Sequence, residues 1–270
     1  MNTLAFVFIF LLGTIIGSFL NVVIYRFNTG KSMVKGRSIC MTCNRNLRWY
    51  ELIPVFSFLI QSGKCRRCAS NISHQYPLVE LSTGLLFAFI SYHFLPIFSV
   101  SILSYIAIVT LYSFIFSLFT VILVYDIRHK IIPDKLVFVF IFASFFSILI
   151  NYTGIGSFFV APTFMSIISG PLFAVPFALL WLVSSGKWMG LGDSKLILGI
   201  GWILGPMATL CALTLSFWIG AVVSLVMMGL SHKKMGMKTE IPFAPFLALG
   251  VLITFFFNLN VLSLTSLFNF

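Results

Sequence analysis

Residues 136–186 read LVFVFIFASFFSILINYTGIGSFFVAPTFMSIISGPLFAVPFALLWLVSSG and contain no charged side chain. An α-helix needs about 20 apolar residues to cross a bilayer, so this run has room for two membrane spans. Other runs without Lys, Arg, Asp or Glu cover residues 4–25, 81–125, 196–232 and 241–270. The pattern predicts an all-α membrane protein that crosses the bilayer several times.

The composition of the 270-residue chain supports a membrane protein, because 60% of its residues are hydrophobic and only 9% are charged. A soluble domain carries about 25% charged residues. The net charge of +11 is also typical of proteins that bind nucleic acid or anionic lipid. Here, however, the Lys and Arg residues gather in segments 26–67, 128–135, 187–195 and 233–238, as the positive-inside rule requires. We therefore expect a lipid bilayer, and no nucleic acid, as a partner.

Eight transmembrane helices follow from these runs and the turns between them. They are expected near residues 4–25, 78–97, 102–125, 136–152, 162–185, 191–208, 209–231 and 242–262. The basic segments place both termini outside and residues 26–77 in the cytoplasm. The expected parts are a first transmembrane helix in 1–25, a small cytoplasmic domain in 26–77 and a transmembrane domain in 78–270. No basic residue precedes the first run, so we expect a retained helix rather than a secretory signal peptide.

Four of the five cysteines form two C-x-x-C pairs in the expected cytoplasmic domain. The pairs are Cys40-Met-Thr-Cys43 and Cys65-Arg-Arg-Cys68, with 21 residues between them. Two such pairs at this spacing are typical of a structural Cys₄ zinc site. A redox dithiol would need a single pair in a thioredoxin-like pattern, and two disulfides are disfavoured in a reducing compartment. Cys211 lies alone in an apolar run and is expected to be a core residue.

Only six acidic residues are present, so each one is informative. They are Glu51, Glu80, Asp126, Asp134, Asp193 and Glu240. Ionisable groups at membrane depth are costly and are candidates for function. Two of the six also allow a purely structural interpretation. Glu51 lies in the basic domain, where water would solvate it. Glu80 begins a span and has basic residues near it with which it could pair.

Asp134 follows Pro133 at the start of an apolar run, and Asp193 follows Gly190 and Gly192 in GLGDSK. Either carboxylate could simply cap the helix that follows it. Glycines at these two positions permit a tight turn and a close approach of the backbone. Lys195, two residues after Asp193, is placed to stabilise its ionised form or to face phosphates.

Asp126 ends an apolar run in VYDIRHK, so that both Asp126 and Asp193 are expected at the cytoplasmic boundary of neighbouring spans. Two carboxyl groups that face each other there would share a proton, because both cannot easily ionise side by side. One member of such a pair can activate water while the protonated member polarises a carbonyl. This arrangement predicts peptide hydrolysis by an aspartic dyad.

Six stretches, in order along the chain, resemble the motifs of the bacterial type IV prepilin peptidases, which are membrane aspartic proteases. They are GSFLNVVIYR at 17–26, RSICMTCNRNLRWYELIPVFSFLIQSGKCRRC at 37–68, ISHQYPLVEL at 72–81, DIRHKIIPD at 126–134, GLGDSKL at 190–196 and IPFAPFLALG at 241–250. The resemblance implies that Asp126 and Asp193 are the catalytic pair. It also implies prepilin or pseudopilin substrates of a pilus or secretion system, cleavage at the cytoplasmic face of the bacterial inner membrane, and N-methylation of the new terminus with S-adenosylmethionine.

The chain departs from the family pattern at Met41, where a proline is usual, at Glu51, where aspartate is usual, and at Ala244, where glycine is usual. These departures bear on substrate fit and methylation more than on proteolysis, and Glu51 and Glu80 stay candidates for contacting the substrate.

Three other interpretations are open. They are an ion-coupled transporter with intramembrane aspartates, a GxGD protease of the presenilin or signal-peptide-peptidase type, and a zinc-stapled scaffold without chemistry.

Overall fold

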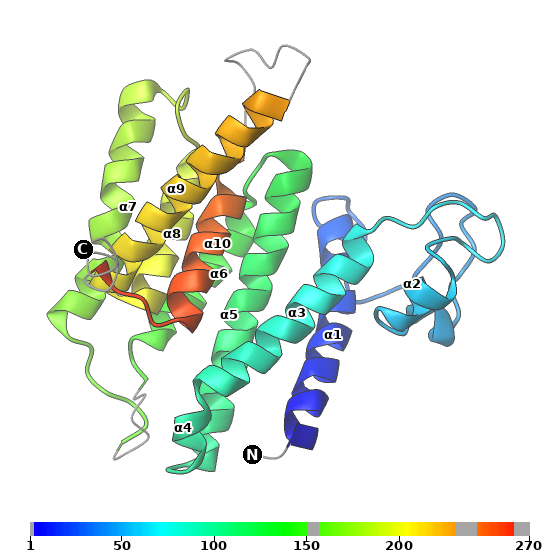
Figure 1. Cartoon of the computed structure of the whole chain (residues 1–270), viewed down its shortest axis with the longest axis horizontal. Coiled ribbons are helices and arrows are strands. Elements are labelled where there is room, and N and C mark those ends of the chain that lie inside the picture. The colour runs from blue at the N-terminus through cyan, green and yellow to red at the C-terminus, as the bar shows by residue number, and fades with distance from the viewer. Residues whose placement is uncertain (1–2, 151–156, 231–241, 262–270) are drawn as a thin grey trace. The chain divides into compact units, whose positions relative to one another are not determined.

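A computed structural model describes residues 3–150, 157–230 and 242–261 of the chain (Figure 1). The chain divides into two compact units, Met1–Val121 and Ile122–Phe270. The helices of the first unit are α1 (Thr3–Arg26), η1 (Trp49–Leu52), α2 (Phe56–Ile60), α3 (Gln75–His93), α4 (Leu95–Phe98) and most of α5 (Ile102–His129). The second unit holds the end of α5 and the helices α6 (Asp134–Ser147), α7 (Phe164–Ser184), α8 (Leu191–Leu204), α9 (Pro206–Leu230) and α10 (Ala244–Phe256).

The prediction of an all-helical membrane protein is confirmed, whereas the number of spans is confirmed only in part. Each of the eight ranges expected to span the membrane contains a helix. Among the described residues, the helices that are long and apolar enough to cross a bilayer are α1, α5, α7 and α9. The helices α6, α8 and α10 are only 13 or 14 residues long. The count of eight spans therefore stays a prediction, and the position of the C-terminus lies outside the described residues.

In the first unit, α1 and α3 pack together through small residues. A Cβ atom on Gly13 would lie 2.9 Å from the Cα of Gly84, and one on Gly17 would lie 2.8 Å from the Cα of Glu80. These separations leave no room for a side chain, so the two backbones are in direct contact. The residues Gly13 and Gly17 form the G-x-x-x-G pattern that allows such close helix packing in lipid, a feature that we did not expect from the sequence.

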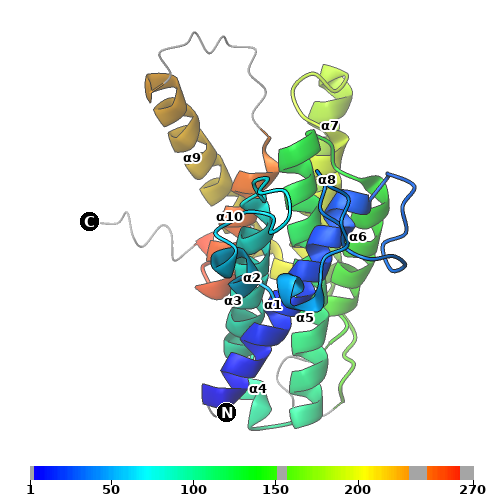
Figure 2. The same cartoon turned by 90° about the vertical axis from the view of Figure 1, so that its right-hand side faces the viewer.

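In the second unit, α8 packs against both α6 and α7. The helices α7 and α8 lie side by side, and α9 contacts both but diverges from them toward its C-terminal end (Figure 1 and Figure 2). Polar contacts hold α8 to α7: the hydroxyl of Ser194 donates to the carbonyl of Ala174 at 2.9 Å, and the indole of Trp202 donates to the carbonyl of Ile167 at 2.9 Å. The first bond holds the beginning of α8, next to Asp193, and the second holds the last turn of the helix.

Candidate active site and metal centre

Asp126 lies in the last turn of α5, where its side chain is buried. The helix ends there because Lys130 adopts a left-handed conformation, with φ of 54°, and donates its N–H to the carbonyl of Asp126 at 2.7 Å. The chain then runs in an extended form to Pro133, which is the N-cap of α6. The end of one membrane helix therefore places a carboxyl group inside the protein.

Asp193 is the third residue of α8, and Gly190 is the N-cap of that helix. The backbone N–H of Gly190 donates to the carboxylate of Asp193. The interpretation of Asp193 as a helix-capping residue is thus compatible with the structure, but its side chain is also buried. A buried carboxylate at a helix N-terminus is stabilised by the unpaired N–H groups there.

The segment after Asp126 and the turn before Asp193 contact each other within the second unit. A Cβ atom on Gly192 would lie 2.7 Å from the Cβ of Ile132, so the turn before Asp193 presses directly on the strand-like segment after Asp126. The two aspartate motifs are therefore in contact within the second unit, and both carboxyl groups are buried, whereas their action as a catalytic pair stays a prediction.

Asp134 and Lys195 form an ion pair between α6 and α8, with 2.6 Å between Oδ1 and Nζ. The interpretation of Asp134 as a helix cap is therefore wrong, because Pro133 occupies the N-cap position and the Asp134 carboxylate binds Lys195 instead. Lys195 likewise turns to Asp134 and also lies 5.4 Å from the ring centre of Phe138. This pair helps to hold the two aspartate motifs together from the outside.

We expect the substitution Lys195→Gln to have a small effect. The Asp134 side chain is 63% exposed, and exposed ion pairs contribute about 0–1 kcal/mol. Since 1.4 kcal/mol corresponds to a factor of ten, the rate of substrate cleavage should fall by no more than about fivefold. Initial rates of the purified variant, compared with those of Asp134→Asn, would test this. A loss of a hundredfold in Lys195→Gln alone would show that Lys195 acts on the reacting groups.

The two C-x-x-C pairs fold into knuckles with the same backbone pattern. In the first, the N–H of Asn44 donates to the carbonyl of Cys40 at 3.0 Å, and in the second the N–H of Ala69 donates to that of Cys65 at 2.9 Å. Both Asn44 and Ala69 are left-handed, with φ of 52° and 54°. Each knuckle is closed by an isolated β-bridge, Ile39 to Asn46 in one and Lys64 to Asn71 in the other. The cysteine segment therefore contains a structural repeat that the sequence alone did not reveal.

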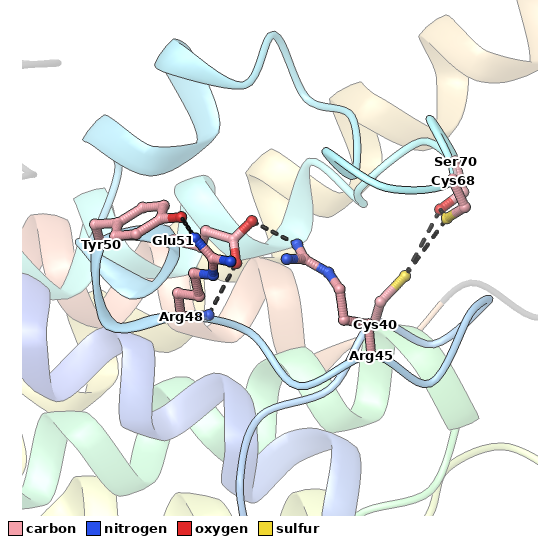
Figure 3. A network of polar contacts seen from close by, with 7 residues as sticks. All are labelled: Cys40, Arg45, Arg48, Tyr50, Glu51, Cys68 and Ser70. Atoms are coloured by element: carbon pink, nitrogen blue, oxygen red, sulfur yellow. Dashed lines mark hydrogen bonds and ion pairs between the residues drawn. The ribbon is translucent and has the colours of Figure 1, made fainter.

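The four cysteines of the knuckles converge, and their sulfur atoms lie within 4.8 Å of one another. All are free thiols, so the alternative of two disulfides is not formed in this structure. The sulfur atoms of Cys40 and Cys68 are 3.9 Å apart (Figure 3). This is close to the sulfur–sulfur distance of about 3.8 Å in a tetrahedral site with Zn–S bonds of about 2.3 Å. The backbone N–H of Cys43 lowers the pKa of the Cys40 thiol to about 6, which favours a thiolate. The donor set fits a metal ion, and zinc is the ion that we expect.

We predict that Cys40→Ser removes the bound metal. A Cys₄ site loses affinity when a thiolate is replaced by a hydroxyl, and the fold of the segment depends on the metal. The metal content of the purified protein should fall from about one zinc per chain to nearly none, as measured by elemental mass spectrometry. Cys211→Ser is the matched control, because Cys211 is buried in α9 and is not one of the four clustered cysteines, so this variant should keep its metal. Full zinc retention in Cys40→Ser would contradict the assignment.

Glu51 is buried rather than solvated, which corrects one expectation from the sequence. Its carboxylate accepts from the guanidinium of Arg45 at 2.6 Å and from the backbone N–H of Arg48 at 2.8 Å (Figure 3). Burial would raise the pKa of Glu51, but these donors together lower it below its usual value. Arg45 also contacts the sulfur of Cys65. The glutamate therefore joins the knuckles to η1, and its oxygens are already occupied by internal donors.

Glu80 is also buried, and it accepts the backbone N–H of Val55 at 2.7 Å instead of pairing with a basic residue. Val55 has φ of 60° and ψ of −52°, and the next N–H, of Phe56, donates to the carbonyl of Pro54 at 2.6 Å. This is a γ-turn of the rare form, strained for a β-branched residue. Sequence reasoning missed this contact, because nothing in the local pattern links residues 55 and 80. Glu240, the remaining acid, lies outside the described residues.

Comparison with known proteins divides the chain into two matched regions. Residues 11–94 match the Bacterial Peptidase A24 N-terminal domain, and residues 113–225 match the Type IV leader peptidase family. The first region contains the knuckles, and the second contains both buried aspartates. No solved structure matches the chain.

Several curated proteins are similar to nearly the whole chain. A prepilin leader peptidase/N-methyltransferase of Bacillus subtilis is 30% identical over 257 residues, which is 94% of this chain and 95% of that protein. A protein of the same name from Pseudomonas aeruginosa is 29% identical over 267 residues, covering 89% of this chain and 86% of its own length. One from Myxococcus xanthus is 54% identical over a shorter stretch of 81 residues, or 30% of this chain and 24% of its own.

Proposed function

Because the chain belongs to the type IV leader peptidase family, we propose that it is a membrane aspartic endopeptidase that removes the leader from prepilin or pseudopilin precursors. The observation that supports the proposal is that Asp126 and Asp193 are both buried, in two motifs that touch through Ile132 and Gly192. Buried carboxyl groups at membrane depth are costly and are kept for function. The similarity to named leader peptidases over nearly the whole chain supports the same activity.

In the proposed mechanism, one carboxylate of the pair takes a proton from a water molecule, which attacks the carbonyl carbon of the scissile peptide. The other carboxyl group, protonated at the start, donates a hydrogen bond to the carbonyl oxygen and stabilises the charge that develops there. A proton then passes to the leaving nitrogen and the C–N bond breaks. The products are the carboxyl end of the leader and the free amine of the mature pilin, and the pair is again left with one proton.

The proposed substrate is itself a membrane helix with a short basic leader on its cytoplasmic side. The family resemblance implies that the leader ends in Gly and that the mature chain begins with Phe or Met. Such a helix can approach through the bilayer and present its cleavage site at the end of α5 and the start of α8. We propose a location in the bacterial inner membrane with eight spans, both termini outside and the cysteine segment on the cytoplasmic side, in agreement with the basic residues.

We further propose that the four cysteines bind structural zinc through Cys40, Cys43, Cys65 and Cys68. The ion would hold the two knuckles together and has no open coordination position for chemistry. N-methylation of the new amine is proposed from the names of the similar proteins. S-adenosylmethionine would supply the methyl group. The described cleft beside the second knuckle, about 640 Å³ and lined by residues such as Phe58, Asn71 and His74, has no carboxylate for the ribose hydroxyls and does not fit this donor.

The proposal is tested by co-expressing the full chain with a tagged type IV prepilin and measuring the mass of the prepilin product. We expect loss of the leader and an added methyl group on the new terminus. A prepilin whose last leader residue, Gly, is replaced is the control and should stay uncut. If the wild-type enzyme leaves a panel of prepilins at full length, the protease proposal fails and an ion-coupled transporter becomes the better interpretation of the two aspartates.

A further inference from the structure

The loop between the two knuckles exposes an uncommon amount of apolar surface. Residues 52–63, here called the apolar tip, read LIPVFSFLIQSG and contain no charge. Among the exposed side chains of the tip, Phe56 is 59%, Leu59 64% and Ile60 72% accessible. On the membrane helix α1, Phe8 is 67% accessible. The tip therefore has the exposure pattern of a lipid-facing surface, although it belongs to a segment expected to lie in water.

The hydrogen bond from the Val55 N–H to the Glu80 carboxylate fixes the position of this tip along α1 and α3. The Glu80 carboxylate also bonds the side chain of Ser18, and a Cβ on Gly17 would touch the Glu80 backbone. Ser18 lies about two turns, or about 12 Å, before the end of α1 at Arg26. Figure 1 shows α2 level with the middle of α1, not above its end. The apolar tip therefore descends beside α1 and α3.

Two tyrosines lie near the C-terminal end of α1 and at the start of α3. The rings of Tyr25, on α1, and Tyr76, on α3, are stacked with centroids 5.1 Å apart. Tyrosines of this kind are typical of the boundary between headgroups and hydrocarbon. Glu80 lies one turn beyond Tyr76, so the Val55 backbone is held about 6 Å deeper than the tyrosine pair. With α1 about 36 Å long and a hydrocarbon core of about 30 Å, this position is inside the core.

We propose that the apolar tip is inserted into the cytoplasmic leaflet of the bilayer and that its ligand is lipid hydrocarbon. The segment between the cysteine knuckles is then a membrane-dipping hairpin rather than a wholly aqueous domain. The zinc-binding knuckles form the neck of this hairpin at the membrane surface. Glu80 is the positioning residue that holds the tip at depth through the strained turn at Val55.

The backbone of the tip is suited to lipid, because unpaired N–H groups are strongly disfavoured in hydrocarbon. Pro54 has no N–H, and Val55 donates to Glu80. The N–H groups of Phe56, Ser57, Leu59, Gln61, Ser62 and Gly63 all donate to backbone carbonyls of the segment 53–59. The irregular turn at the entrance is thus satisfied internally, so no water is needed there.

Basic residues flank the tip on both sides, at the neck. Arg48 precedes it, and Lys64, Arg66 and Arg67 follow it. Arg66 stacks over the ring of Tyr50 at 5.2 Å. Arg and Lys at this level bind anionic headgroups, whereas a surface meant for a second copy of the chain would gain nothing from concentrated positive charge. The charge pattern therefore favours lipid over a protein partner.

The test uses the full chain in vesicles of phosphatidylglycerol and phosphatidylethanolamine. A ketone-bearing amino acid replaces Leu59, so that a nitroxide can be attached without touching the cysteines. The same label at Phe8 is the lipid control, and at Val34, an 85% exposed residue of the segment 31–36, it is the water control. We expect the label at residue 59 to match Phe8, with high collision rates for oxygen and low rates for a water-soluble nickel complex.

Two results would overturn the proposal. Nickel accessibility at residue 59 equal to that at Val34 would place the tip in water. Shielding from both oxygen and nickel would place it under a protein surface instead of lipid. In a second comparison, Glu80→Ala should raise nickel accessibility at residue 59, whereas Glu80→Gln, which keeps an oxygen acceptor for Val55, should not. If Glu80→Ala retains its zinc and leaves the label in lipid, Glu80 does not set the depth.

Discussion

Replacement of Asp193 by Asn should abolish prepilin cleavage, with a loss of at least about a thousandfold in rate. Asn cannot take or give the proton that a carboxyl pair must exchange, and general acid–base groups contribute about 10²–10⁴-fold to catalysis. The cleavage rate of Asp126→Asn should fall by a similar factor. In the proposed dyad the two carboxyl groups act as one unit, so the rate losses of the two substitutions are not additive. The double variant is therefore expected to be no slower than either single one. Initial rates on a purified prepilin in detergent would measure all three.

Each Asn variant should still insert into the membrane, because Asn is nearly isosteric with Asp and the N–H of Gly190 can donate to its amide oxygen. Membrane yield and zinc content are the controls for folding. If Asp193→Asn folds and cleaves at the wild-type rate, its carboxylate only caps α8 and the active site lies elsewhere. If both variants are inactive but the double variant is far slower still, the two groups act separately rather than as a dyad.

The substitution Gly192→Ala should reduce cleavage by about ten- to a hundredfold, whereas Gly190→Ala should be nearly neutral. A Cβ at Gly192 would lie 2.7 Å from Cβ of Ile132, which is too close for real atoms, so the turn must move away from the segment after Asp126. A displacement of about 1 Å at an active site can cost a hundredfold in rate. At Gly190, where φ is −75°, the added methyl would make only ordinary contact at 3.6 Å with the Asp193 carboxylate.

A double-mutant cycle separates this steric effect from a general loss of stability. Ile132→Gly removes all three atoms that a Cβ on residue 192 would meet, including the Cβ at 2.7 Å, so the pair should recover most of the activity that Gly192→Ala loses. Rates and membrane yields of the four proteins are to be compared. Equal losses for Gly190→Ala and Gly192→Ala would show that both glycines serve the backbone conformation, and the contact with Ile132 would then have no special weight.

The sequence was most informative where charge and cysteine are scarce. The uncharged runs located every long helix of the described chain, because a membrane span needs an apolar surface on all sides. The four cysteines and the two boundary aspartates could be singled out because such groups are costly or reactive and have few alternative uses. The convergence of the cysteines is confirmed, whereas spacing alone gives no distance between residues 126 and 193, and their pairing stays a prediction.

What the sequence did not reveal are contacts between segments far apart in the chain. Glu51 was expected to be solvated. Its carboxylate is instead bound by Arg45 and the backbone of Arg48, and these contacts depend on how the knuckle folds. The bond from Val55 to Glu80 depends on a γ-turn that has no residue signature. The partner of Lys195 was also missed, because Asp193 is its neighbour in sequence while Asp134 is its neighbour in space.

The division of contacts between the two units has a consequence for biosynthesis. The packing of α1 on α3 uses only residues that leave the ribosome early, so this hairpin can assemble while the remainder of the chain is still being translated. Asp126 emerges next, but its partner follows only when α8 has been made. Between these moments one buried carboxyl group lacks the helix that completes its surroundings. In the proposed mechanism, the order of translation therefore keeps the nascent chain inactive until its second unit folds.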